Sequence, residues 1–124
     1  MNVDFVAINI TSADPDALMT FYRDVVGLAG WPGMEFALAA GSAMLTFDNH
    51  SEITGRAKEP ARWLLNLGVA NLPDETVRLK AAGVVCLRDQ GREDWGGVIS
   101  TFVDPDGNYF QLMMGPDATA AAST

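Results

Sequence analysis

The order of structural elements implied along the chain most constrains its fold, because the same order occurs twice. In the first half an apolar run precedes Asp14-Pro15, which fits a helix N-cap and a first-turn proline, and Gly27 is placed to end that helix. Pro73 and Gly83 repeat this frame in the second half, and strand-like runs follow both glycines. Neither unit is large enough to bury a sheet alone, so the repeat predicts two paired modules with a cavity between their sheets.

Residue type and hydrophobic periodicity set the bounds of the expected elements. In the first module we expect a strand over 5–10, a helix over 15–26 and a hairpin of strands over 34–40 and 43–48. In the second we expect a strand over 63–69, a helix between Pro73 and Gly83, a strand over 84–87, a polar loop over 88–97, and strands over 98–103 and 108–114. The last two strands flank Asp104-Pro105-Asp106-Gly107, a strong turn sequence.

Three predictions concern packing in the second module. The apolar positions of its helix are expected to be Val77, Leu79, Ala81 and Ala82. Trp63 alternates with Leu64 along the expected strand and should therefore pack beneath this helix. Cys86 is the single cysteine, so an intrachain disulfide is impossible, and its apolar run favours a small core residue over a nucleophile.

Length and composition indicate one globular domain. The chain has 124 residues, of which 48% are hydrophobic and 19% are charged. We expect modules over about 3–50 and 61–114, a linker or mobile flap over 49–61, and a disordered tail over 115–124 that is rich in Ala, Ser and Thr. No apolar run is long enough to cross a membrane, and the first residues do not resemble a signal peptide, so we expect a cytoplasmic protein.

The chain is acidic, with 16 Asp and Glu against 8 Lys and Arg, giving a formal net charge of −8. This charge repels phosphate backbones and anionic membranes, so neither nucleic acid nor a membrane is an expected partner. It leaves two interpretations open. The charge either favours a cationic small molecule or serves only to keep the protein soluble.

Several motifs together resemble the vicinal oxygen chelate superfamily. They are Phe21-Tyr22-Arg23-Asp24-Val25-Val26-Gly27-Leu28, the turn Asp104-Pro105-Asp106-Gly107-Asn108, and Trp95-Gly96 upstream of that turn. That superfamily contains glyoxalase I, bleomycin-resistance proteins, fosfomycin-resistance enzymes and extradiol dioxygenases. The resemblance spans Val3 to Met114 and implies an α+β fold, in which two βαβββ modules form a curved mixed sheet around a central cavity within a single domain over 1–114.

The resemblance also implies where a metal would be held, and these positions lack suitable donors. The superfamily's four ligand positions fall on Phe5, near Met44, on or beside Leu64, and on Gln111. A divalent site needs about three side chains with N, O or S donors. The single histidine, His50, lies beside the expected linker. We therefore expect no metal and no cofactor.

Without a metal, the inward strand positions predict a small-molecule pocket lined by apolar groups and amides. By strand alternation these positions are Phe5, Ala7, Asn9, Met44, Thr46, Asp48, Leu64, Asn66, Tyr109, Gln111 and Met113. Trp31 and Trp95, in loops at strand ends, are further candidates for ligand contact. Two alternatives remain open: the amides satisfy one another in a filled core, or the loop tryptophans contact a partner subunit.

The sequence thus favours a metal-free protein that binds or sequesters a small organic, cationic aromatic ligand, similar to the bleomycin-resistance branch. The first alternative is a metal-dependent lyase, isomerase or dioxygenase, or a metal-free catalyst using Asp48 or Tyr109 as general acid–base. A second alternative is an accessory domain with a filled cavity. The superfamily implies a homodimer, and the sequence leaves open whether its modules pair within one chain or are exchanged between two.

Overall fold

The structure is a computed structural model that describes residues 1–116. The chain divides into two compact units, Met1–Arg56 and the residues from Ala57 onward. Each unit contains one four-stranded mixed sheet, with a helical segment between its first two strands. This confirms the α+β class and the two βαβββ-like modules. The cavity expected between the modules stays a prediction.

The boundary between the units falls inside the segment over 49–61 that the sequence predicts to be a linker. The structure places no helix or strand in that segment. Of the tail expected to be disordered, residues 117–124 lie outside the described residues. Over residues 1–116, no helix is long and apolar enough to span a membrane.

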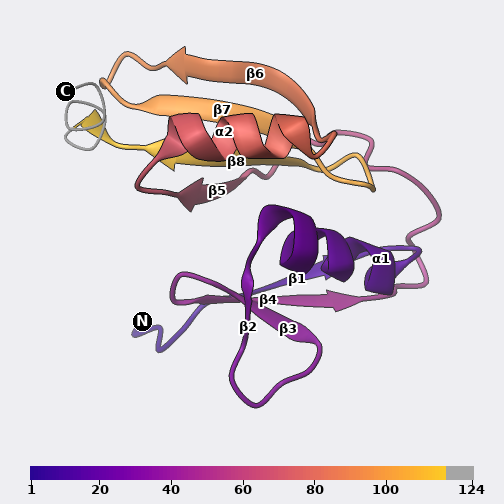
Figure 1. Cartoon of the computed structure of the whole chain (residues 1–124). Helices are drawn as coiled ribbons and strands as arrows, with labels where there is room; N and C mark the ends of the chain where they lie inside the picture. The colour runs from indigo at the N-terminus through magenta and orange to yellow at the C-terminus, as the bar shows by residue number, and fades with distance from the viewer. Residues whose placement is uncertain (117–124) are drawn as a thin grey trace. The chain divides into compact units, whose positions relative to one another are not determined.

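The first unit has its helical segment packed on one face of its sheet (Figure 1). Its elements are β1 (Ala7–Thr11), α1 (Pro15–Thr20), η1 (Phe21–Val26), β2 (Ala29–Gly30), β3 (Ala37–Ala40) and β4 (Ala43–Asp48). The strand order is β1-β4-β3-β2. β1 runs parallel to β4, and the other pairs are antiparallel. β1 begins two residues after the expected start, so Phe5 precedes the strand, while the predicted reversal between β3 and β4 is confirmed.

The helical segment of the first unit begins and ends as the sequence predicts. The side chain of Asp14 accepts a hydrogen bond from the Ala17 N–H at 3.2 Å, and Gly27 ends the segment with φ of 97°. From Phe21 onward the segment is a π-helix, which the sequence did not indicate. Its buried side chains pack on the sheet, where the rings of Tyr22 and Phe47 lie 5.8 Å apart between centroids.

In the second unit, the helix α2 crosses one face of a sheet with the same topology (Figure 1). The elements are β5 (Leu65–Gly68), α2 (Leu72–Ala81), β6 (Val85–Arg92), β7 (Val98–Val103) and β8 (Tyr109–Met114). The strand order is β5-β8-β7-β6, with β5 parallel to β8. Because β5 begins only at Leu65, Trp63 lies outside the strand and is 87% exposed, so the prediction that it packs beneath the helix is wrong.

The buried face of α2 differs from the expected one. Leu72, Thr76 and Leu79 are fully buried, whereas Val77 is 62% exposed. These three buried residues follow helical spacing, and Thr76 is accepted in the core because its hydroxyl hydrogen-bonds the Ser100 hydroxyl at 2.8 Å. The sequence analysis therefore missed Thr76 as a core position, because it counted only apolar residues.

Strand β6 extends through Arg92, so the prediction of a loop over 88–97 is wrong for its first residues. The register with β7 shifts twice, between Cys86 and Arg88 and between Arg88 and Gly91. Gln90 has φ of 53° and donates its N–H to the Ser100 hydroxyl at 3.0 Å. β6 is an edge strand, where polar side chains remain solvated and bulges are common, and its composition therefore resembles a loop.

The turn between β7 and β8 is organised by the side chain of Asp104, which is 3% exposed. Its Oδ1 accepts from the N–H groups of Asp106 and Asn108, both at 2.9 Å, and its Oδ2 accepts from the side-chain amide of Asn108 at 2.9 Å. The turn aligns Val103 with Tyr109. It thereby sets which β7 and β8 residues lie opposite one another.

Candidate functional site

The helix-free face of the first sheet carries a small polar pair among apolar groups. β1 and β4 place Ala7 opposite Met44 and Asn9 opposite Thr46. Leu45 and Phe47, which point the other way, are buried on the helical side. The Thr46 hydroxyl donates to the Asn9 side-chain oxygen at 2.9 Å. The sequence analysis placed all four residues on this face, and the register agrees with that placement.

A longer polar row crosses the helix-free face of the second sheet. The registers place Asn66 opposite Gln111 and Gln111 opposite Thr101, on three adjacent strands. The Thr101 hydroxyl donates to Gln111 Oε1 at 2.8 Å, and Gln111 Nε2 donates to Asn66 Oδ1 at 2.7 Å. We call these three residues the amide row. The row fixes the orientation of both amides and leaves the exposed Nδ2 group of Asn66 at its end.

Thr101 was missed by the sequence analysis, although the other two residues of the row, Asn66 and Gln111, were both proposed. A signal existed, because Thr101 alternates with the apolar Phe102 and lies opposite Gln111 once the turn sets the register. The amides of Asn66 and Gln111 hydrogen-bond one another, and Asn66 is exposed while Gln111 is half-buried. The two alternatives for these amides, orienting a ligand or filling a core, stay predictions.

Apolar side chains flank the amide row on both sides. Val103 lies opposite Tyr109 beyond one side of the row, and Ile99 lies opposite Met113 beyond the other. All four side chains are half-buried. A face with a central line of oriented polar groups and apolar borders matches the usual composition of small-ligand sites.

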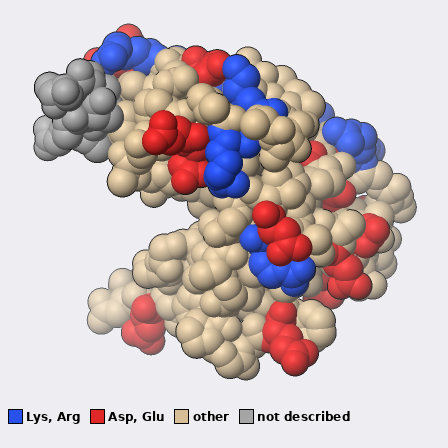
Figure 2. Space-filling view, in the orientation of Figure 1, with Lys and Arg blue, Asp and Glu red and all other residues tan. Residues whose placement is uncertain are grey.

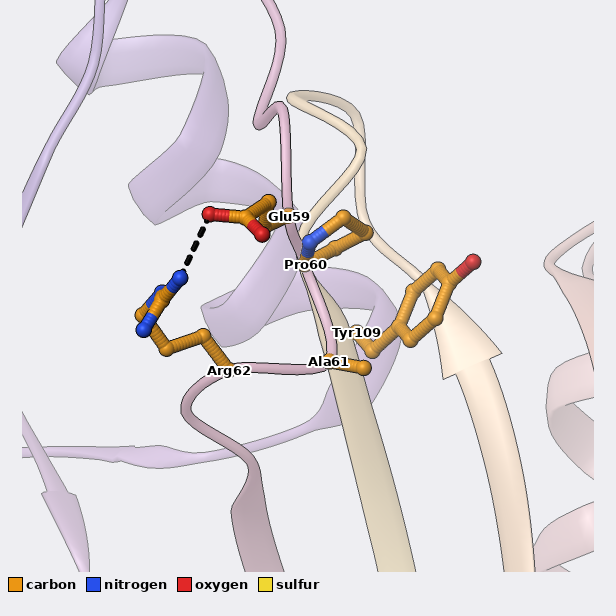
Figure 3. Close-up of a pocket in the computed structure, with 5 residues that line it drawn as sticks. All are labelled: Glu59, Pro60, Ala61, Arg62 and Tyr109. Carbon is orange, nitrogen blue, oxygen red and sulfur yellow. Dashed lines mark hydrogen bonds and ion pairs between the residues drawn. The ribbon is translucent and has the colours of Figure 1, made fainter.

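An open hollow of about 450 Å³ lies at the Tyr109 end of this unit (Figure 3). It is lined by Glu59, Pro60, Ala61, Arg62 and Tyr109. Arg62 and Glu59 form an exposed ion pair at 2.6 Å, and Figure 3 shows the Tyr109 ring beside Pro60. Of these residues the sequence analysis proposed only Tyr109, because the others belong to the segment that it assigned to the linker and its end.

The remaining candidate residues lie at element ends. Phe5 precedes β1 and is 64% exposed, and Trp31 is half-buried in the β2–β3 connection. Asp48 ends β4, where its carboxylate accepts the Asn49 N–H at 2.9 Å. Trp95, in the β6–β7 connection, is 51% exposed. Their roles in ligand binding stay predictions.

The superfamily implies a divalent metal, and the donor set does not fit one. Phe5, Leu64 and Met44 offer at most a thioether. The fourth position, Gln111, already uses its carbonyl oxygen to accept from Thr101 and its amide nitrogen to bond Asn66. Among residues 1–116, no group of three or more His, Cys, Asp or Glu side chains is arranged to hold a metal ion.

Ion pairs dominate the solvent side of α2. Arg78 pairs with Glu75 at 2.8 Å and Lys80 pairs with Asp89 at 2.6 Å, and Figure 2 shows acidic and basic side chains side by side over this helix. The hydrogen bond from Lys80 lowers the pKa of Asp89, and the same bond raises the pKa of Lys80. Burial, aided by the Asp89 charge, raises the pKa of the Cys86 thiol. A raised pKa keeps that thiol protonated and disfavours nucleophilic chemistry.

Comparison with known proteins places this geometry in a family. A family model described as a glyoxalase-like domain matches residues 6–113. None of the curated proteins matches the chain at a significant level.

Solved structures share the fold at low sequence identity. TnmS3, an antibiotic binding protein from Streptomyces sp. CB03234, has 23% identity and a TM-score of 0.69, covering 93% of this chain and 98% of its own. A glyoxalase/bleomycin resistance protein/dioxygenase superfamily member from Sphaerobacter thermophilus DSM 20745 has 17% identity and a TM-score of 0.72, covering 91% and 98%. A lactoylglutathione lyase from Agrobacterium tumefaciens has 21% identity and a TM-score of 0.69, covering 93% and 96%.

The family match therefore extends over both modules, from the residue before β1 to the last residue but one of β8. The two-module topology agrees with it, and so do the motifs at Phe21–Val26 and in the β7–β8 turn. The chain belongs to the glyoxalase-like domain family, within the vicinal oxygen chelate superfamily.

Proposed function

We propose that this protein binds a small organic molecule without a catalytic metal. The amide row on the helix-free face of the second sheet carries the proposal. Thr101 and Gln111 fix the row at one end, so the Asn66 amide is already oriented before a ligand arrives. An oriented donor loses less conformational entropy on binding than a free side chain.

The chemistry around the row favours an aromatic ligand. Val103, Tyr109, Ile99 and Met113 offer apolar contact on either side, and aromatic rings bury much apolar area for few rotatable bonds. The predicted contact by Trp95, which belongs to the same unit, would enlarge this apolar surface. Phe5 and Trp31 stay predicted ligand contacts within the first unit. The antibiotic-binding neighbour TnmS3 supports the same class of function, at the level of a shared fold.

The proposal extends to biological context in three respects. The protein sequesters its ligand and does not transform it, it acts in the cytoplasm, and it works as a homodimer. The donor set supports sequestering, because within residues 1–116 the superfamily's ligand positions carry no set of side chains that would hold the usual divalent metal. The net charge of −8 would assist a ligand that carries a positive group at some distance from the row.

Tryptophan fluorescence titration tests the proposal. Bleomycin, a cationic glycopeptide, and a planar quinone antibiotic are added to the full-length protein, and quenching with saturation is expected for at least one of them. Gln111→Leu keeps a similar size but removes the amide that orients Asn66, and it should weaken that binding by about tenfold, since one hydrogen bond to a ligand is worth roughly this factor. Elemental analysis of protein purified without chelators should find less than stoichiometric transition metal.

Val77→Ala is the matched control, because Val77 lies on the solvent side of α2, away from the amide row. This variant should bind like the wild type. Absence of quenching by every antibiotic, or equal binding by the Gln111→Leu and Val77→Ala proteins, would overturn the proposal. A stoichiometric metal would redirect it toward an enzyme.

A further inference from the structure

Strand β6 holds a distorted segment that the amide row does not explain. The two register shifts and the left-handed backbone of Gln90 occur within five residues of Arg88. A non-glycine residue with φ of 53° costs about 1 kcal/mol, and such strain persists where surrounding contacts maintain it. Here the Ser100 hydroxyl accepts the Gln90 N–H, and Thr76 in turn bonds Ser100.

In this distorted segment the side chain of Arg88 runs along its own strand toward Gly91 and Arg92. A Cβ atom at Gly91 would overlap the Arg88 guanidinium, so that group lies directly on the Gly91 backbone. Gly91 is opposite Ile99, and Ile99 and Thr101 share the helix-free face by strand alternation. Arg88 therefore lies on the same face as the amide row.

The guanidinium is held in place but retains donor capacity. Nη1 donates to the Glu93 carboxylate and Nη2 donates to the Arg92 carbonyl at 3.3 Å. A guanidinium has five N–H donors, and these two bonds use only part of that number. The Arg88 side chain is also the more exposed member of the pair, at 44% against 28% for Glu93.

Trp95 lies in the loop between β6 and β7, two residues after Glu93. A Cβ at Gly97 would overlap the six-membered ring of the Trp95 indole, so the ring lies on the Gly97 backbone. The Glu93 N–H donates to the Gly97 carbonyl at 2.9 Å, and this bond closes the loop between β6 and β7 next to the last strand pair. Gly91 and Gly97 thus hold a cation and an aromatic ring at the same end of the β6–β7 hairpin. The cation bonds the Glu93 carboxylate, and the ring lies on the glycine whose carbonyl bonds the Glu93 N–H.

We propose that Arg88 and Trp95 form a recognition corner for a planar aromatic group that carries a carboxylate or carbonyl oxygen at its edge. The ring stacks on the Trp95 indole, and the oxygen accepts from the Arg88 guanidinium. This inference rests on the proposed function and adds the ligand's polar edge to it. It departs from the expectation, drawn from net charge, that the recognised group is cationic.

Three probes that share the naphthalene ring system but differ in head group test the corner: 2-naphthoate, 2-naphthalenemethanol and 2-naphthylmethylammonium. Affinities are measured by calorimetry, and the indole N–H resonances of 15N-labelled full-length protein report the location. The carboxylate should bind about tenfold tighter than the alcohol or the ammonium, as for a hydrogen bond between charged groups. Its binding should shift the Trp95 resonance, assigned with Trp95→Phe.

The glycines allow each contact to be displaced while the contacting residue itself is retained. Gly91→Ala displaces the end of the flexible Arg88 side chain and should remove the preference for the carboxylate probe. Arg88→Gln should remove the same preference, and it keeps the test valid if the Gly91→Ala protein folds poorly. Gly97→Ala displaces the ring and should weaken all three probes. Gly55→Ala is the matched control, because no atom lies within 4 Å of its added Cβ.

Equal affinity for the three probes, tighter binding of the ammonium, or an unchanged preference in Arg88→Gln would overturn the corner. If a probe binds and shifts the signals of Gln111 and Asn66 but not Trp95, the corner is wrong and the proposed function stands. If no probe binds, the corner is wrong, and the proposed function is judged by the antibiotic titration alone.

Discussion

Replacing Asp104 should destabilise the second module more than its place in a surface turn suggests. The Asp104 carboxylate accepts at least three hydrogen bonds within the β7–β8 turn, from two backbone N–H groups and one side-chain amide, all at 2.9 Å. Asp104→Ala leaves these donors without that acceptor in a partly buried site. At about 1 kcal/mol per bond, the free energy of unfolding should fall by about 2–4 kcal/mol.

Asp104→Asn separates the contributions. The asparagine oxygen can still accept both backbone N–H groups, but its amide nitrogen would face the donor amide of Asn108. The expected loss is therefore smaller, about 1–2 kcal/mol. Urea unfolding followed by circular dichroism measures both variants, and the midpoint for Asp104→Ala should fall by about 1 M or more.

Asp106→Ala is the control within the same turn. Asp106 contributes its backbone groups, which alanine retains, so the change should stay within about 0.5 kcal/mol. Equal unfolding free energies for the Asp104→Ala and Asp106→Ala proteins would refute the account of the turn. The turn sets the register between Thr101 and Gln111, so Asp104→Ala should also weaken binding at the amide row.

Two further predictions concern α2 and the strand beside it. Leu79→Ala should lower the free energy of unfolding by about 2–5 kcal/mol, because removing its fully buried side chain leaves a cavity. Val77→Ala, on the exposed side of α2, should change it by less than about 0.5 kcal/mol. Similar thermal midpoints for the two variants would contradict the buried face described for α2. The Cys86 thiol should react with a disulfide reagent at pH 8 more slowly than free cysteine, since burial and the Asp89 charge raise its pKa. Asp89→Asn should lower that pKa and speed the reaction. A rate above that of free cysteine would contradict the raised pKa.

Much of the fold was predictable because local chemistry determines it. Asp14, Gly27 and the Asp104-Pro105-Asp106-Gly107 turn act over a few residues, and the structure confirms the element ends that they predict. Strand alternation likewise placed Asn9, Thr46, Asn66 and Gln111 on the helix-free faces. These features depend only on the chirality and hydrogen bonding of the chain near each residue.

Other features needed contacts between distant residues. Thr76 is buried because Ser100 bonds it, and the polar end of β6 is a strand because β7 pairs with it. Trp63 is exposed because β5 begins later than its composition suggests. Composition reports only what a residue prefers on average, and here a tertiary partner or its absence decided the outcome.

For the candidate site too, some features follow from the sequence and others from contacts between distant residues. The sequence by itself determined the family, the two modules and the lack of metal donors at Phe5, Met44 and Leu64, because these follow from residue identity at motif positions. Only the tertiary structure decided that Thr101, Gln111 and Asn66 join in one row, and that Arg88 and Trp95 lie on two glycines at the same end of the β6–β7 hairpin. Both arrangements depend on cross-strand register and on bulges, which arise from pairing between segments far apart in the chain.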